Sequence, residues 1–368
     1  MRANPAYRLI PWLQLPERDR RFLARVMGSP SPFVLLPQAT DGLHAKAVDE
    51  DAARLIRELT EPAPVPGFFF DGACSERRLQ QLVLDSVLEV ECGGKFVSGP
   101  SSIDLVAGPA PRAEARDRLS QLSLAALRYA ATLPIADCRL LSSRLYTYNT
   151  VPSGPRWRRA YPETDSVRNA LGLGERGAQR AMLVEVYDEV DSPHWLVWRR
   201  YDAKPVMRLA RKLYVSPQPE DLLVVFPRVI DAFLLHCVPS FKVGRDLHGI
   251  LRPDKLVAYF ADARSMEGTA ADLRAALDGC RAQGVPFSAA LDPGGLLSWG
   301  RDPPPEEQLP GWTYGESWRL WITNQLALAL LHAKRSGSAI EPWQYAIRRL
   351  DVEGVDTVLW APTGSLWY

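Results

Sequence analysis

The sequence has little cysteine and histidine, and neither residue type is spaced for a disulfide framework or a metal site. Only five of the 368 residues are Cys and five are His. The cysteine count is odd and no C-x-x-C pair occurs, which predicts reduced thiols in a cytoplasmic protein. The histidines form no H-E-x-x-H or related spacing, so we expect no protein-bound metal.

Long apolar runs and a surplus of charge of one sign are also missing. No stretch approaches the roughly 20 apolar residues of a membrane-spanning helix. Residues 1–21 lack the apolar core and small-residue cleavage site of a secretory signal. The formal net charge is only +1, so bulk electrostatics gives no reason to expect nucleic acid or an anionic membrane as a partner.

Lysine is the scarce basic residue. Only seven of the 44 basic residues are Lys, and four of these seven lie between residues 204 and 255. Arg stays protonated in proteins, whereas Lys can lose its proton and act as a base. One interpretation is that these lysines are required for chemistry. The other is a chance distribution of solvated side chains.

Alternating apolar and polar residues predict strands around these lysines. The runs 181–190, 193–202 and 206–217 are rich in Val, Tyr and Trp, as strands are. Further strands are predicted over 240–244 and 252–262, and 141–152 is predicted to be extended. Helices are predicted over 115–133, 219–238 (kinked at Pro227), 268–284 and 316–335.

These elements predict an α+β fold in two parts. Residues 1–135 form a mainly helical N-terminal region of unknown role. Residues 136–368 form a domain with a mixed or antiparallel sheet flanked by helices.

Polar residues recur in order along the predicted strands. Lys212 and Tyr214 alternate with apolar residues, so they point to one face of their strand. After the predicted helix, Lys242 stands in an F-K-V strand. Arg252 and Lys255 then precede the apolar strand that follows. The order is K-x-Y, helix, F-K-V, R-x-x-K.

This order resembles the lyase domain of phosphothreonine lyases and of class III lanthipeptide synthetases. It resembles more closely the HopA-type effector family, whose relatives occur in class V lanthipeptide and thioamitide gene clusters. The resemblance covers about residues 205–335. It implies a phosphothreonine-lyase-like fold and a carbon–oxygen lyase. Such an enzyme eliminates phosphate from phosphoserine or phosphothreonine in a ribosomal precursor peptide, leaving dehydroalanine or dehydrobutyrine.

The chemistry of this elimination gives each residue type a role. An α-proton beside an amide is weakly acidic, so a close base and a stabilised oxyanion are needed. Lys242, between apolar neighbours and near other cations, is the candidate base, and a charged Lys212 would hold the amide oxygen. Tyr214 stands where better-known lyases have His and is the candidate general acid. The candidate phosphate-binding residues are Arg211, Arg252 and Lys255.

The resemblance implies no metal or organic cofactor. No kinase signature is present, so the expected partners are a phosphorylated precursor peptide, a separate kinase and a cyclase. Two other functions stay open: a non-catalytic (phospho)peptide-binding scaffold and a host-targeted effector.

Purely structural roles also stay open for individual residues. Lys212 could be structural on a half-exposed strand, and Arg252 and Lys255 could cap a strand entrance beside Asp254. The Arg-rich aromatic segments 156–165 and 195–202 could bind a peptide or form the packed face of a strand. The G-x-G-x-x-G match at 172–177 follows no strand and is predicted to be a loop.

Overall fold

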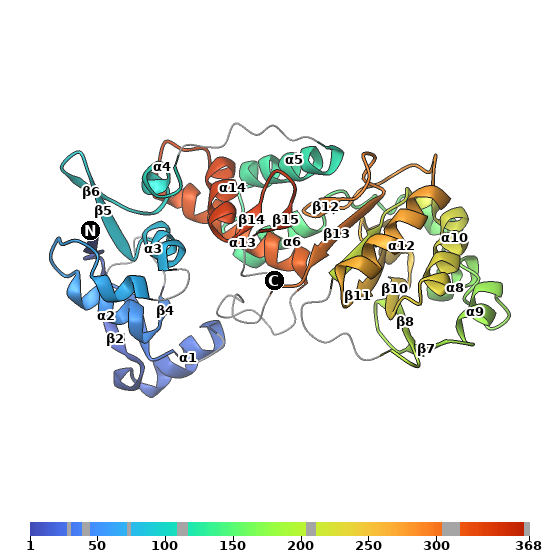
Figure 1. The fold of residues 1–368 in the computed structure, drawn as a ribbon, viewed down its shortest axis with the longest axis horizontal. Helices are drawn as coiled ribbons and strands as arrows, with labels where there is room; N and C mark the ends of the chain where they lie inside the picture. The colour runs from blue at the N-terminus through green and yellow to red at the C-terminus, as the bar shows by residue number, and fades with distance from the viewer. Residues whose placement is uncertain are drawn as a thin grey trace.

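The computed structural model describes residues 1–27, 31–38, 45–71, 75–108, 117–203, 211–303 and 317–363. The molecule is elongated, with two small sheets at one end, a helical middle and a large sheet at the other end (Figure 1). Helices and antiparallel sheets alternate along the chain, which confirms the predicted α+β class.

The large sheet has seven strands in the order β12-β13-β9-β11-β10-β8-β7. Every neighbouring pair is antiparallel. The strands predicted around the lysines occupy its centre. In chain order the strands are β7 (Tyr187–Val190), β8 (Trp195–Arg200), β9 (Arg211–Val215), β10 (Ser240–Gly244), β11 (Leu256–Phe260), β12 (Ala289–Ala290) and β13 (Leu297–Arg301).

One face of this sheet is apolar because side chains alternate along each strand. Trp198, Leu213 and Phe241 point to this face and join a buried core with α10 (Leu222–Leu235) and α12 (Ala263–Ala276). Figure 1 shows both helices lying against the sheet. Helix α10 continues through Pro227. The opposite face of the sheet carries the side chains of Lys212, Tyr214 and Lys242.

A second core lies in the helical middle of the molecule. It joins α5 (Arg118–Thr132), α6 (Cys138–Tyr146), α13 (Trp318–Ser336) and α14 (Pro342–Val352). Residues 141–152, predicted to be extended, instead begin within α6, so that prediction was wrong. Asp137 starts this helix by accepting the N–H of Leu140 at 2.7 Å. A side-chain cap of this kind favours a helix over the β propensity of the residues that follow.

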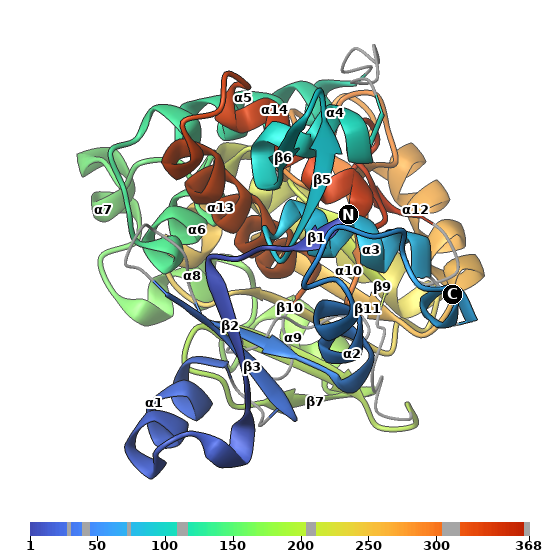
Figure 2. The ribbon, with the colours of Figure 1, turned by 90° about the vertical axis from the view of Figure 1, so that its left-hand side faces the viewer.

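The N-terminal region contains more strands than the sequence predicted. Besides its helices it forms two three-stranded sheets, β1-β5-β6 and β2-β3-β4, which face the viewer in Figure 2. In chain order, the strands and α-helices of this region are β1 (Arg2–Ala3), β2 (Tyr7–Pro11), α1 (Glu17–Met27), β3 (Phe33–Pro37), β4 (Lys46–Val48), α2 (Glu50–Glu58), α3 (Ser75–Leu84), β5 (Leu88–Cys92), β6 (Lys95–Val97) and α4 (Ile103–Val106). Residues on both sides of position 135 share the second core.

The remaining elements are short. Residues 181–190, predicted as one strand, divide between α9 and β7, whereas the loop predicted at 172–177 lies between α8 and α9. The short elements are α7 (Pro155–Ala160), α8 (Thr164–Ala170), α9 (Ala178–Leu183), α11 (Leu247–Leu251), β14 (Val355–Asp356) and β15 (Ala361–Pro362).

Candidate functional site

The candidate site lies on the face of the large sheet that α10 and α12 do not cover. Tyr214 on β9 pairs with Val257 on β11, and Val257 pairs with Lys242 on β10. Lys212, two residues before Tyr214, pairs with Tyr259 in the next row. Residues paired across strands point to the same face, so the register brings Lys212, Tyr214 and Lys242 together.

Lys242 stands among aromatic rings and cations. Its Nζ is 4.2 Å from the centroid of the Trp195 ring and 5.7 Å from that of Tyr259. Burial, followed by the positive charge of Lys212, lowers the pKa of Lys242 to about 8. A substantial fraction of this amine is therefore neutral near physiological pH, as a proton acceptor must be.

Lys212 is held by a carboxylate that the sequence did not single out. Its Nζ is 2.6 Å from Oδ1 of Asp302, and the lysine is 6% exposed. The same oxygen accepts the backbone N–H of Trp318 at 3.0 Å, at the start of α13. The Nζ also lies 5.4 Å from the Tyr259 ring centroid. Lys212 is therefore a buried, carboxylate-paired cation beside Lys242.

Arg252 contacts the Trp195 indole ring, which Lys242 also contacts. Its Cζ is 4.9 Å from the Trp195 centroid. Its Nε and Nη2 donate to the two oxygens of Asp254, each at 2.9 Å, and Nη2 also donates to the Tyr146 hydroxyl at 3.3 Å. Among the described residues, none accepts a hydrogen bond from Nη1. The hydrogen bonds to Asp254 fit the alternative in which Arg252 caps the entrance of a strand, but they are only part of its contacts.

Asp254 is the centre of a buried charge cluster. Its Oδ2 is 2.8 Å from Nη1 of Arg319 and accepts the Tyr146 hydroxyl at 3.0 Å. Burial opposes ionisation, but Arg319 and Arg252 outweigh it and hold the pKa of Asp254 well below its usual range. Burial and this carboxylate raise the pKa of Tyr146 to about 12. The cluster ties α6 and α13 to the entrance of β11.

Tyr214 is poorly suited to give up a proton. It is 3% exposed and packs with Val257 and Val285. Burial raises the pKa of its phenol well above the ordinary value of 10. A phenol with a raised pKa is a weaker acid than an exposed Tyr. The structure thus places Tyr214 beside the lysines but weakens its expected acid role.

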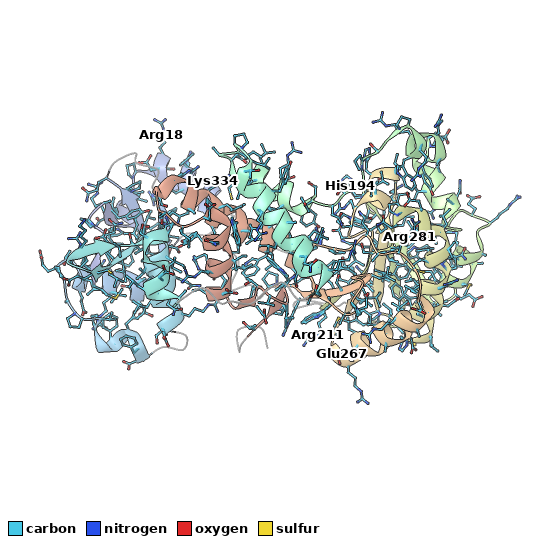
Figure 3. The ribbon with its side chains drawn as sticks, turned by 90° about the horizontal axis from the view of Figure 1, so that it is seen from above. Arg18, His194, Arg211, Glu267, Arg281 and Lys334 are labelled. Atoms are coloured by element: carbon cyan, nitrogen blue, oxygen red, sulfur yellow. The ribbon has the colours of Figure 1, made fainter. Side chains whose placement is uncertain are left out.

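Lys255 has its amine enclosed in the protein, and Arg211 points to the other face of the sheet. Lys255 is fully buried, and its Nζ donates to the carbonyl of Pro217 at 2.7 Å and to Oε1 of Gln283. Arg211, labelled in Figure 3, points to the opposite face of β9, where α12 packs. Its charge reaches Asp262, which caps that helix. Neither residue belongs to the candidate site.

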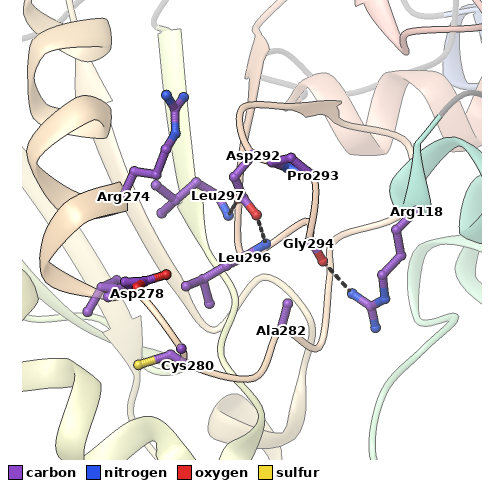
Figure 4. A pocket seen from close by; sticks show the side chains of 12 residues that line it. Arg118, Arg274, Asp278, Cys280, Ala282, Asp292, Pro293, Gly294, Leu296 and Leu297 are labelled. Atoms are coloured by element: carbon purple, nitrogen blue, oxygen red, sulfur yellow. Dashed lines mark hydrogen bonds between the residues drawn. The ribbon is translucent and has the colours of Figure 1, made fainter.

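A hollow of about 470 Å³ lies elsewhere, between α5 and the C-terminal end of α12 (Figure 4). No predicted site residue lines it. Arg118 donates to the carbonyl of Gly294 at 3.0 Å, and Arg274 donates to that of Leu291. Asp292 accepts the backbone N–H groups of Leu296 and Leu297. These side chains brace loops and present no convergent group to a ligand.

The sequence analysis gave no role in the site to four residues that belong to it: Tyr146, Trp195, Asp302 and Arg319. Trp195 stood in a segment noted for peptide binding, but nothing marked its contact with Lys242. Within the described residues no group of three or more His, Cys, Asp or Glu is placed to hold a metal ion. Of the helices described, none is long and apolar enough to cross a membrane.

Comparisons with known proteins give a distant resemblance in structure. No protein-family model matches the chain, and no curated protein sequence matches it. The chain is similar to the effector protein from Pseudomonas syringae pv. tomato strain DC3000, with a TM-score of 0.40 and 13% identity over 67% of this chain and 100% of that one. The effector protein from P. syringae pv. syringae strain 61 gives 0.39 and 13% over the same shares.

Proposed function

We propose that the protein is a carbon–oxygen lyase that eliminates phosphate from phosphoserine or phosphothreonine in a peptide. The product is dehydroalanine or dehydrobutyrine. The observation that carries this proposal is the position of Lys242, whose amine has a pKa of about 8 beside the charged Lys212. A neutral amine next to a fixed ammonium group suits the removal of a proton from carbon beside an amide.

The proposed step has two parts. The neutral Nζ of Lys242 takes the α-proton, while the ammonium group of Lys212 stabilises the negative charge that develops on the amide oxygen. The electron pair of the broken Cα–H bond then forms the Cα–Cβ double bond. The Cβ–O bond breaks, and its electrons leave with the phosphate. No oxidant, reductant or cofactor is required.

Departure of the phosphate depends on cations more than on an acid. Arg252 is the described residue best placed to receive it, because Nη1 keeps two N–H donors while Asp254 fixes the rest of the guanidinium group. Tyr214, with its raised pKa, contributes less as an acid. Lys255 and Arg211 have no part in this proposal.

The test is mass spectrometry of phosphothreonine and phosphoserine peptides incubated with the purified protein without ATP. We expect loss of phosphoric acid from the peptide, abolished by Lys242→Ala. Lys242→Arg keeps the positive charge but cannot act as the base, so it should retain peptide binding and lose elimination. Lys95→Arg, at an exposed position of β6, is the matched control and should retain both.

The same assay separates the alternatives. A protein that binds phosphopeptides but leaves them intact, with Lys242→Arg binding as wild type does, would be a scaffold. As substrate we propose a precursor peptide phosphorylated by a separate kinase. A host-targeted effector would instead act on phosphoproteins, so the two substrate classes should be compared directly.

A further inference from the structure

The face of the large sheet that carries Lys242 changes from buried to exposed across the strands. In the register row of Lys242, Val257 on β11 and Tyr214 on β9 are 2% and 3% exposed. On the other side of Lys242, the row continues through Val197 on β8 to Val190 on β7, and both valines are partly exposed. Figure 1 shows β7 and β8 at the end of the sheet away from α13. The open side of Lys242 in this row therefore lies over β8 and β7.

The neighbouring row of side chains opens in the same direction. Lys212 is 6% exposed, whereas Tyr259 and Ser240, which follow it across the sheet, are partly exposed. Beyond Ser240 the row ends in Arg199 and Asp188, which pair across β8 and β7 and are both exposed. Their charges are opposite, so the exposed end of this row has no net charge.

The open part of the Lys242 row is apolar. Val197 lies directly opposite Lys242 in the register, and Trp195, two residues earlier on β8, reaches Lys242 diagonally, with its ring centroid 4.2 Å from Nζ. Trp195 is also partly exposed. Two valines and an indole ring thus form a surface beside the reacting amine that gains free energy by covering itself with an apolar group.

We propose that Val190, Val197 and Trp195 form a subsite for an apolar side chain of the substrate peptide, two positions from the phosphorylated residue. The inference rests on the proposed function. In an extended chain, residues two positions apart point to the same side and lie about 7 Å apart. Strands β8 and β7 lie about 5 and 10 Å from β10. With the phosphorylated residue at Lys242, the second side chain therefore falls between the two valines.

The test uses phosphothreonine peptides that differ only in carrying Leu or Gln at one position, up to three residues on either side of the phosphothreonine. Binding is measured by fluorescence anisotropy with Lys242→Arg, so that the peptide stays intact, and elimination by mass spectrometry with the wild type. At one position, two residues from the phosphothreonine, we expect the Leu peptide to bind about five- to tenfold tighter than the Gln peptide.

Three further substitutions, each added to Lys242→Arg, locate the subsite. Val197→Thr exchanges a methyl group for a hydroxyl group and should reduce the Leu preference to less than about twofold. Val190→Arg should make a Glu peptide bind about five- to tenfold tighter than the Gln peptide, a new preference that a misfolded protein cannot gain. Val224→Thr, at a valine of α10 that is 58% exposed on the other side of the sheet, should keep the Leu preference.

The outcomes separate the subsite from the chemistry. Equal binding of the Leu and Gln peptides at every position, together with elimination by the wild type, would overturn the subsite and leave the lyase proposal standing. A Leu preference without elimination by the wild type would support the subsite and overturn the lyase. A Leu preference that is unchanged in both Val197→Thr and Val190→Arg would also overturn the subsite.

Discussion

Lys212 of β9 and Asp302, the residue that follows β13, form an ion pair with Nζ 2.6 Å from Oδ1. The same oxygen accepts the N–H of Trp318, the first residue of α13. One carboxylate group therefore holds a buried ammonium group and fixes the start of a long helix. In the proposed reaction, this pair orients the charge that meets the amide oxygen.

Asp302→Asn should separate these two tasks. Asn keeps an oxygen for the Trp318 amide but removes the charge that orients Lys212. We expect the elimination rate to fall about 10- to 100-fold and the free energy of unfolding to fall by about 1–3 kcal/mol. Asp302→Ala, which also loses the helix contact, should unfold at lower urea concentration. Wild-type elimination by Asp302→Asn would exclude a role for the charge.

The elimination rate should rise with pH and level off above an inflection near 8, the pKa of Lys242. Below that value most of the amine is protonated and cannot accept the α-proton. The pH profile of kcat/KM checks this. A rate that is flat or falls as the pH rises through this value would contradict Lys242 as the base.

Lys212→Met gives this pH profile an internal control. The positive charge of Lys212 is one cause of the lowered pKa of Lys242. Removing it favours the protonated amine, so the residual activity should show an inflection at higher pH. An inflection that stays in place would mean that another group is being titrated.

The Asp254–Arg319 pair should dominate the stability of the site. Both residues are almost fully buried, at 4% and 1% exposure. Asp254→Asn leaves Arg319 without its charge partner, and we expect the free energy of unfolding to fall by about 3–5 kcal/mol. Glu17→Gln, which breaks the exposed pair with Arg21, should cost less than about 0.5 kcal/mol. Urea denaturation followed by tryptophan fluorescence measures both.

The pH dependence of stability gives a second measure of this pair. The pKa of Asp254 is depressed in the folded protein. Its contribution is therefore present above the ordinary Asp pKa of about 3.9 and is lost as the pH falls through the lower folded value. Asp254→Asn should lose less stability than the wild type over that acid range.

Lys255→Met tests the residue that the structure removes from the site. The substitution deletes the hydrogen bonds to Pro217 and Gln283. We expect the free energy of unfolding to fall by about 1–3 kcal/mol while the elimination rate of the folded protein stays near the wild-type value. A selective loss of phosphopeptide affinity, with unchanged stability, would restore Lys255 to phosphate binding.

The strands that carry the lysines could be predicted because their signal is local. Residues 206–210 of the predicted strand 206–217 lie outside the described residues, but alternation in 211–215 and in F-K-V sets which side chains share a face, and the register places Lys212 and Lys242 on one side. The prediction for 141–152 was wrong because an Asp cap and packing against α13 decided its structure. The helix predicted over 316–335 is α13, which Ser317 caps.

The rest of the site depends on contacts between distant segments. Asp302 and Arg319 reach the sheet from the end of β13 and from α13, and no sequence spacing relates them to Lys212 or Asp254. Lys255 was predicted to bind phosphate as part of the R-x-x-K motif, and Arg211 directly precedes Lys212 of the K-x-Y motif. Strand alternation turns Arg211 to the opposite face of the sheet, and full burial encloses the amine of Lys255.

The order of synthesis gives the position of Arg319 a further consequence. All seven strands of the large sheet are complete by residue 301, but one of the two arginines that pair with Asp254, Arg319, lies in α13. A nascent chain that ends before α13 has every predicted lysine, but Asp254 then has Arg252 as a cation partner without Arg319. The charge cluster can therefore assemble only after the ribosome has added the last long helix, and a prematurely terminated chain would carry the lysines without a finished site.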